Sequence, residues 1–463
     1  MRRSATLGPN ADDPVVGRKS VAGGARHHLL SMGGMMTFRD FDLAEGIRRN
    51  RAAGDFAFAS ICSAHPDVLA AALDHARDGG WPIVVEATSN QVNQFGGYTG
   101  MKPADFIAFV ATIAEAAGYP AGKIVFGGDH LGPQAWRSRP ADEAMALAET
   151  MVRSYVEAGF TKIHLDCSEG CRGEPAQLDD AVVAERAARL ARACEAAAGQ
   201  GAAKLRYVVG TEVPPPGGAR GAHAPIVPTD PDRALGTIEA HRRAFEREGL
   251  GAAWSRVCAL VVQPGLEFGP AHVDHFDTAR PDRLSPVLEA FPTLAFEAHS
   301  TDYQKAAVYP DLARRHFAVL KVGPALTHAY REAIYGLSHI DGWLTGSTHV
   351  SAVMEDLMLA EPRSWSGHYD EADAATAKVM RHFGYADRIR YYWAKPAALE
   401  AVAALTARFD AAQSLPRPML EQYFTAEEVD RALGRDGPPS ANLVRARIRS
   451  ALKPYFWAGE ADA

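Results

Sequence analysis

Cysteine is scarce in this chain. Five cysteines occur in 463 residues, and their odd number and wide spacing argue against a disulfide framework. Cys167 and Cys171 are four positions apart, but no second pair of cysteines or histidines stands at zinc-finger spacing, so we do not expect a structural zinc site. Sparse cysteine is typical of a reducing compartment, and we expect a cytoplasmic location.

Long apolar runs and an excess of basic residues are also missing. No stretch reaches the roughly 18 consecutive apolar residues of a membrane span, so no membrane association is expected. The formal net charge is −7, which provides no broad basic surface for nucleic acid, although a small anionic ligand could bind at a local site. The nucleotide-binding pattern Gly-x-x-x-x-Gly-Lys-Ser/Thr does not occur, so the sequence does not support a sugar kinase.

Residues 1–34 are rich in Gly, Ala, Arg and Ser and lack the apolar centre of a signal peptide. We interpret them as a disordered leader, or as sequence upstream of the natural start, because Met35 and Met36 stand just before the first helical pattern.

The middle of the sequence alternates short β-branched runs with alanine-rich stretches of helical spacing. This alternation is typical of βα units and a parallel sheet, and eight such units favour a closed (β/α)₈ barrel over an open doubly wound sheet. We therefore predict an α/β protein with a barrel over residues 35–340. The predicted strands are Phe56–Ser60, Ile83–Glu86, Ile124–Gly128, Lys162–Asp166, Tyr207–Thr211, Val257–Val262, Leu294–Glu297 and Ala318–Val322. The predicted helices begin near Pro66, Pro103, Ala141, Asp180, Asp230, Arg283, Gln304 and Pro324.

The last part of the chain has a different texture. From about residue 345 to residue 460 the pattern is helical with charged faces, so we predict a helical extension over residues 341–463. The cluster Arg388–Trp393 (RIRYYW) is its least ordinary segment. It is interpreted either as a helix-packing anchor or as a subunit contact or lid over the barrel mouth.

Polar side chains stand at the carboxyl end of every predicted strand. In barrels of this type these ends meet at one mouth, where the chemistry takes place. Buried charges are costly unless they are paired or bind a cation. The large number of ionisable groups at one mouth therefore predicts a metal or a polar ligand.

The best metal-ligand candidates are His130, Glu212 and His299, with Gln263 as a fourth. Two imidazoles with a carboxylate suit Zn²⁺, Mn²⁺, Ni²⁺ or Co²⁺. Asp129 could act as the acid/base, or it could orient a metal ligand by hydrogen bonding to it. Glu212 is a second candidate for the acid/base.

His164 lies two residues from Asp166 on the same strand face, so we expect it to support the site from behind. The remaining polar groups at the mouth are candidates for binding a hydroxylated substrate. They are Ser63, Glu86, Asn90, Gln91, Asp166, Ser300, Asp302 and Lys321.

Several long motifs make the sequence similar to a known family. They are residues 86–100 (EATSNQVNQFGGYTG), 127–133 (GGDHLGP), 210–214 (GTEVP), 262–265 (VQPG), 297–304 (EAHSTDYQ) and 320–326 (LKVGPAL). From about Met36 to the C-terminus the chain resembles the GatZ/KbaZ subunit of class II D-tagatose-1,6-bisphosphate aldolase. The resemblance implies a TIM barrel related to class II aldolases, with Asp129 as acid/base and His130 and His299 as metal ligands.

The chain departs from class II aldolases at three places. Gln263 stands where those enzymes carry a third histidine, and Glu212 could compensate. Ser300, Thr301 and Asp302 stand where a glycine-rich loop would cradle phosphate, and an aspartate there would repel a phosphate unless it faces away. The segment from Cys167 to Cys171 replaces a small residue and a methionine of the family, which gives the loop after the fourth strand its own character.

The resemblance leaves two functions open. The GatZ/KbaZ subunit is described as a non-catalytic partner that stabilises a separate aldolase subunit, whereas some relatives resemble ketohexose 4-epimerases acting on tagatose and fructose. Because the ionisable strand ends are all present, we predict metal-dependent retro-aldol chemistry on a ketohexose or its phosphate. The alternative is a scaffolding subunit. We expect a homo-oligomer, with a separate aldolase subunit as a possible partner.

Overall fold

The computed structural model describes residues 42–210, 226–347, 349–369, 373–412 and 415–457. They belong to one compact unit that runs from Met36 to Ala463. The predicted leader, residues 1–34, and the predicted ligand Glu212 lie outside the described residues.

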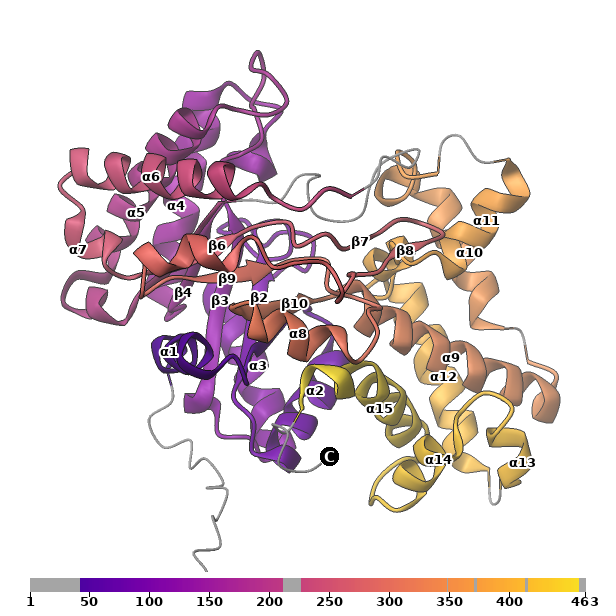
Figure 1. Ribbon diagram of the computed structural model, residues 1–463. Coiled ribbons are helices and arrows are strands. Elements are labelled where there is room, and N and C mark those ends of the chain that lie inside the picture. The colour runs from indigo at the N-terminus through magenta and orange to yellow at the C-terminus, as the bar shows by residue number, and fades with distance from the viewer. Residues whose placement is uncertain (1–41, 211–225, 348, 370–372, 413–414, 458–463) are drawn as a thin grey trace, which may run out of the picture. The chain divides into compact units, whose positions relative to one another are not determined.

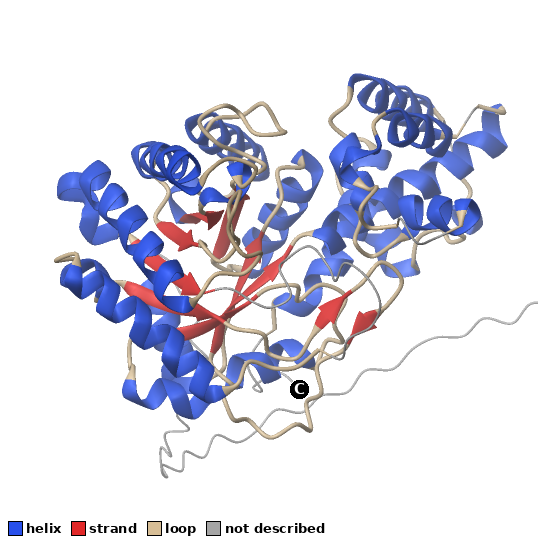
Figure 2. Ribbon diagram, turned by 90° about the horizontal axis from the view of Figure 1, so that it is seen from above, coloured by secondary structure: helices blue, strands red, loops and turns tan. Residues whose placement is uncertain are grey.

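Eight parallel strands close into a barrel, which confirms the predicted fold (Figure 1). Each strand pairs with the next along the chain, and the last pairs with the first, so that Phe58 stands opposite Val319. Figure 2 shows the strands in the centre with helices around them. The strands are β1 (Phe58–Ile61), β2 (Ile83–Thr88), β3 (Ile124–Leu131), β4 (Lys162–Leu165), β5 (Arg206–Gly210), β6 (Val257–Val261), β9 (Ala295–Ala298) and β10 (Phe317–Val322).

Helices of the barrel begin close to the predicted positions. Proline occupies the first turn of four of them, where its fixed φ suits the helix and its missing N–H is not needed. The helices are α2 (Pro66–Gly79), α3 (Pro103–Ala117), α4 (Ala141–Ala158), α5 (Asp180–Ala198), α6 (Pro231–Arg247), α7 (Gly251–Trp254), α8 (Val308–Arg314) and α9 (Pro324–Thr345).

Two predicted helices differ from the structure. Near Arg283 the chain forms a 3₁₀ helix over Ser285–Ala290, and α8 begins at Val308 rather than near Gln304. The physical reason is that the side chain of Gln304 is bound to the preceding connection, where it accepts a hydrogen bond from the Phe276 N–H (3.0 Å). The same connection carries a small hairpin of β7 (Glu267–Phe268) and β8 (Val273–Asp274).

The amino-terminal half of the barrel interior is apolar. Helix α1 (Leu43–Ala53) closes this end, and its Leu43 and Ile47 are buried against residues that point inward from the strands. These inward residues include Phe58, Val84, Val125, Val208 and Val319. The polar strand residues therefore gather in the other half, at the carboxyl ends of the strands.

Helix α9 joins the barrel to the helical extension. It runs through the predicted boundary at residue 340 and ends at Thr345, so the two parts share one helix. The extension contains α10 (Val350–Ala360), α11 (Ala374–Phe383), α12 (Pro396–Ala411), α13 (Arg417–Leu420), α14 (Ala426–Leu433) and α15 (Pro439–Leu452), orange to yellow in Figure 1. Helix α15 packs on α2 and α9, and Arg449 forms an ion pair with Asp78 of α2 (2.6 Å).

Among the described residues, no helix combines the length and the apolar character that crossing a membrane requires.

Gly127 of β3 leaves no room for a larger side chain, because the Glu86 side chain packs against it. A methyl group on Gly127 would lie 2.7 Å from the Cγ and Oε1 atoms of Glu86, which is closer than real contacts allow. We expect Gly127→Ala to lower the free energy of unfolding by about 1–3 kcal/mol, because the buried Glu86 carboxylate must move. Urea denaturation measures this change.

The matched control is Gly236→Ala, at an exposed position of α6 with open space around it. We expect this variant to gain about 0.5–1 kcal/mol from the better helix propensity of alanine. A Gly127→Ala protein as stable as the wild type would show that Glu86 is not confined.

Candidate functional site

An irregularity in β3 places two consecutive side chains at the barrel mouth. In a regular strand Asp129 and His130 would point to opposite faces. Here the pairing of β3 with β4 shifts register between Gly128 and Leu131, and His130 takes a left-handed backbone with φ 47°. A bulge of this kind re-aims side chains, and it lets both residues enter the same site.

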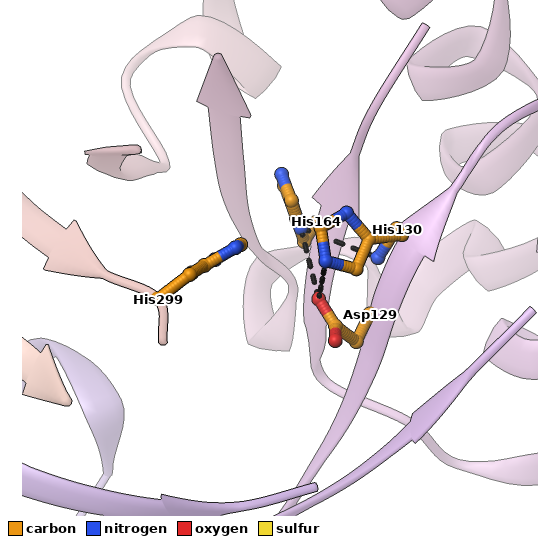
Figure 3. Close-up of side chains that lie close together, drawn as sticks. All are labelled: Asp129, His130, His164 and His299. Carbon is orange, nitrogen blue, oxygen red and sulfur yellow. Dashed lines mark hydrogen bonds and ion pairs between the residues drawn. The ribbon is translucent and has the colours of Figure 1, made fainter. Parts of the chain in front are cut away.

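Asp129, His130, His164 and His299 form one cluster. All four are buried, and each offers a ligand atom within 4.8 Å of the others. Figure 3 shows His299 reaching from β9 toward Asp129 and the two other histidines, which come from β3 and β4. Three imidazoles and a carboxylate are a donor set that suits Zn²⁺, Mn²⁺, Co²⁺ or Ni²⁺.

His130 is oriented by a carboxylate behind it. Its Nδ1 lies 2.9 Å from the Oδ2 of Asp166, and its Nε2 faces Asp129. Asp166 is itself held by the backbone N–H (3.0 Å) and the hydroxyl (2.6 Å) of Ser168. Burial raises the pKa of Asp166, but the hydrogen bond and charge of His130 outweigh this and hold it well below its usual range. Asp166 therefore stays ionised and fixes the imidazole ring.

The other two histidines are fixed in the same manner. The Nε2 of His164 lies 3.0 Å from the carbonyl oxygen of Gly210, and the Nε2 of His299 lies 2.9 Å from the Oε1 of Glu297. Each ring thus has one nitrogen bound to an oxygen acceptor, and the other nitrogen belongs to the cluster. Metal-binding histidines carry this kind of outer partner, so the arrangement fits a divalent metal.

Two buried lysines link the carboxylates beneath the cluster. Lys162 bridges Glu86 and Glu297, with 2.8 Å to the latter, and Lys321 bridges Asp129 and Glu86. Burial lowers the pKa of Lys162, but Glu297 and Glu86 raise it above its usual value. Burial likewise raises the pKa of Asp129, whereas His130 and Lys321 hold it well below its usual range. Lys162 and Asp129 are therefore both charged.

A cavity of about 330 Å³ opens above the cluster, within the size range of small-molecule sites. Seven predicted metal, catalytic or substrate-binding residues line its wall together with Asp129 and His130. They are Ser63, Asn90, Gln91, His299, Ser300, Asp302 and Lys321.

The helical extension supplies the outer wall of this cavity. A 3₁₀ helix over Arg388–Tyr392 places Arg388, Arg390 and Tyr391 on the lining. The segment is fastened to α9 by a hydrogen bond from the Thr327 hydroxyl to Asp387. Arg388, Arg390 and Tyr391 thus form a wall over the barrel mouth. Ile389, Tyr392 and Trp393 are buried in the core, as the packing-anchor interpretation of the same segment expects.

One oxygen of the Asp302 carboxylate is bound to the backbone of the protein. Its Oδ1 accepts hydrogen bonds from the backbone N–H groups of Gly323 (3.0 Å) and Ala325 (2.8 Å) at the start of α9. Burial raises the pKa of Asp302 to about 6, although these two N–H groups favour the charged form. The carboxylate thus occupies the positive end of the helix.

Three predicted residues lie elsewhere. Glu86 and Asp166 lie behind the cavity wall, where they hold Lys162 and His130. Gln263 lines a second cavity, and its side-chain oxygen accepts hydrogen bonds from the N–H groups of Gly265 (2.8 Å) and Leu266 (3.0 Å). This geometry does not support Gln263 as a metal ligand, because its oxygen holds the loop.

Sequence reasoning missed Lys162 and gave His164 only a supporting role. Lys162 and His164 are two residues apart on β4, so the alternation that related His164 to Asp166 also points Lys162 inward. No strand alternation points to Arg390, which reaches the mouth through tertiary packing, and only the unusual composition of Arg388–Trp393 indicated it.

Lys162 tests the importance of the buried ion pairs. We expect Lys162→Met to lower the free energy of unfolding by about 3–5 kcal/mol, because it leaves the buried carboxylates of Glu86 and Glu297 with only the more distant Lys321 as a cation. Urea denaturation followed by circular dichroism measures the loss.

The matched control is Lys395→Met, which removes a surface ion pair with Glu361 (2.6 Å). Its expected cost is below about 1 kcal/mol. Equal losses in the two variants would refute the role given to Lys162.

The histidine cluster makes a separate prediction about metal. We expect His164→Ala or His299→Ala to weaken Mn²⁺ or Zn²⁺ binding by at least about 10–100-fold, the loss typical even of an outer partner. Metal content after dialysis, measured by mass spectrometry, reports the change. His275→Ala, at an exposed position, is the control. Unchanged metal content in both cluster variants would rule out this ligand assignment.

Comparison with known proteins agrees with this geometry. The model of the family "D-tagatose-1,6-bisphosphate aldolase subunit GatZ/KbaZ-like" matches residues 43–460. A crystal structure from Sinorhizobium meliloti 1021, of a protein described as a probable tagatose 6 phosphate kinase, is 44% identical, covers 86% of this chain and 99% of its own, and has a TM-score of 0.79.

Two aldolase structures are more distant. The YdjI aldolase from Escherichia coli K12 is 12% identical, with a TM-score of 0.39 and coverage of 78% of this chain and 99% of its own. The fructose-bisphosphate aldolase from Campylobacter jejuni is also 12% identical, with a TM-score of 0.41 and coverage of 77% and 92%. On the family match and the 44% identical relative, the chain belongs to the GatZ/KbaZ-like family of D-tagatose-1,6-bisphosphate aldolase subunits, a carbohydrate aldolase-related family.

Proposed function

We propose that this chain breaks and re-forms the C3–C4 bond of a ketohexose or its phosphate in a metal-dependent retro-aldol reaction. The product is a C4-epimerised ketohexose, as in tagatose/fructose 4-epimerisation, or two trioses, as in the cleavage of tagatose bisphosphate. The observation that carries this proposal is the cluster of three oriented histidines beside a buried carboxylate and a lysine, all next to one small cavity.

The metal and the protein have separate tasks in this reaction. A divalent ion held by His130, His164 and His299 would supply Lewis-acid stabilisation for negative charge on the oxygens at C2 and C3. Asp129 is ionised and accepts the proton of the C4 hydroxyl. As the C3–C4 bond breaks, C4 becomes an aldehyde and the bonding pair passes to C3, which leaves an enediolate across C2 and C3.

Lys321 remains cationic beside Asp129 throughout. Burial lowers the pKa of Lys321, but Asp129 and Glu86 raise it well above its usual value. The lysine can therefore stabilise negative charge near the base without giving up its proton. If the aldehyde turns and adds back through its other face, Asp129 returns the proton to O4 and C4 is inverted. If the aldehyde leaves, the outcome is cleavage.

A kinase activity has less support. The relative from Sinorhizobium meliloti is described as a probable tagatose 6 phosphate kinase, which agrees with a tagatose-type substrate. The sequence of this chain contains no Gly-x-x-x-x-Gly-Lys-Ser/Thr motif to hold a nucleotide.

A second candidate is a scaffolding subunit for a separate class II tagatose-bisphosphate aldolase. The family is described as an aldolase subunit, and large apolar side chains are exposed on the helical extension and the end of α9. Trp343 is 81% exposed, and Leu359 and Leu399 are more than half exposed. Such a surface fits a protein partner.

Turnover by the purified chain alone distinguishes the two functions. The chain is loaded with Mn²⁺, Co²⁺, Ni²⁺ or Zn²⁺ in turn and supplied with D-tagatose, D-fructose and their 6-phosphates and 1,6-bisphosphates, and the products are separated by sugar chromatography. We expect C4 inversion or triose release that is lost with EDTA. No turnover of any of these sugars would contradict the proposal and favour the scaffolding role.

Asp129 is tested in the same assay. We expect Asp129→Asn to keep the fold and to lower kcat by about 10²–10⁴-fold, the usual contribution of a general base. Asp436→Asn, at an exposed position, is the control. An Asp129→Asn enzyme with wild-type kcat would exclude the role of Asp129 as the base.

A further inference from the structure

We propose that Arg388 and Arg390 bind a single oxyanion at the C6 end of the substrate, a phosphate ester or a carboxylate, and that the site has no place for a second anion at C1. This inference rests on the proposed function, because the orientation of the sugar follows from holding O2 and O3 at the histidine cluster. The substrate class is then a ketohexose 6-phosphate or a ketohexuronate, and not the 1,6-bisphosphate.

The two arginines are held in place by one aromatic ring. The guanidinium carbons of Arg388 and Arg390 lie 4.6 and 4.5 Å from the centre of the Tyr391 ring. Both guanidinium groups also donate to the Tyr391 hydroxyl, at 3.4 and 3.0 Å. Two positive groups held this close repel one another, and an anion between or beside them removes that cost.

Arg390 is a partly buried cation that the carboxylates of Asp387 and Asp302 influence electrostatically without forming an ion pair with it. It donates to the carbonyl oxygens of Ala386 (2.6 Å) and Asp387 (3.0 Å) and to Tyr391. No carboxylate of the described chain forms an ion pair with it, unlike Lys321, which is paired with Asp129 and Glu86 at the bottom of the same cavity. A half-buried guanidinium attracts an anion more strongly than one in open water, and its planar donors match phosphate and carboxylate.

The cavity has an inner part at the histidine cluster and an outer part at the helical extension. The histidine cluster and Lys321 form the inner part, and Arg388, Arg390 and Tyr391 belong to the wall that the helical extension adds. If O2 and O3 are held at the cluster, C4 to C6 extend toward the outer wall. An anion at C6 would therefore meet the arginines.

The usual alternative anion position is already filled. In barrels of this type, phosphate commonly binds at a helix start near the last two strands. Here the Asp302 carboxylate accepts the Gly323 and Ala325 N–H groups at the start of α9. A second phosphate would have to displace this carboxylate and would be repelled by it.

Binding of sugars that differ only in their charged ends tests the inference. D-tagatose, D-tagatose 6-phosphate, D-tagatose 1,6-bisphosphate and D-tagaturonate are titrated into the metal-loaded full chain by calorimetry. We expect the 6-phosphate or the uronate to bind at least about tenfold more tightly than free tagatose, the gain expected from one charge-assisted hydrogen bond. The bisphosphate should bind no more tightly than the 6-phosphate. The ratio of 6-phosphate to uronate affinity identifies the anion.

Variants then assign the preference to the arginines. Arg390→Gln or Arg388→Gln should abolish the preference for the anionic sugar over free tagatose, since each variant removes one of the two guanidinium groups that bind the anion. Arg390→Lys should retain part of the preference, because it keeps the charge and loses the planar donors. Arg363→Gln, at an exposed position of the same extension, is the control.

The outcomes separate this inference from the proposed function. Equal binding of free tagatose and both anionic sugars, or a preference unchanged in both glutamine variants, overturns the inference, whether or not tagatose is turned over. Tighter binding of the bisphosphate than of the 6-phosphate overturns the single-anion claim. Binding that depends on the arginines, without turnover of any sugar, would support the anion site and contradict the proposed function. No binding of any of these sugars overturns both.

Discussion

The ion pairs of two buried lysines are the interaction on which the rest of the site depends. Lys162 and Lys321 tie together carboxylates from β2, β3 and β9 inside the barrel. Each charge would be costly to bury alone, and the set is stable only because opposite charges alternate. The same contacts set the positions of the proposed catalytic groups, since Glu297 orients His299 and Lys321 holds Asp129. The network therefore links the stability of the barrel to the geometry of its mouth.

Local strain then adapts a regular barrel to this network. The bulge in β3 and the left-handed His130 bring adjacent residues into one site, and Ser300 after β9 also has a left-handed backbone, with φ 52°. Such conformations cost of order 1–3 kcal/mol each and persist only where surrounding contacts enforce them. At His130 the enforcing contact is the hydrogen bond to Asp166. The reactive geometry is thus prepared in the folded protein.

The fold and much of the site could be predicted from sequence because both follow local rules. The alternation of β-branched and alanine-rich stretches predicted the closed barrel. The residues at the ends of the predicted strands included Asp129, His130 and His299, which lie together in the structure. The assignment of Gln263 shows the limit of this method, because position at a strand end does not reveal that its oxygen holds the Gly265 loop. Arg390 shows a deeper limit. No periodicity connects it to the barrel, and only the packing of the extension on α9 brings it to the mouth.

The division between barrel and extension has a consequence for specificity. The proposed chemistry depends on residues of the barrel strands, whereas the outer wall of the cavity depends on Arg388–Tyr392. This segment is tied to the barrel by contacts such as Thr327 to Asp387 and Tyr303 to the Tyr385 carbonyl. Tyr455, near the end of the described chain, also donates to the Thr301 carbonyl in the loop after His299. On the proposed function, substitutions in the extension would change which end group is accepted without altering the groups proposed to break the C3–C4 bond. Relatives that share the cluster but differ at positions 388, 390 and 302 are expected to act on differently charged sugars, because those positions contribute charge to the wall of the cavity.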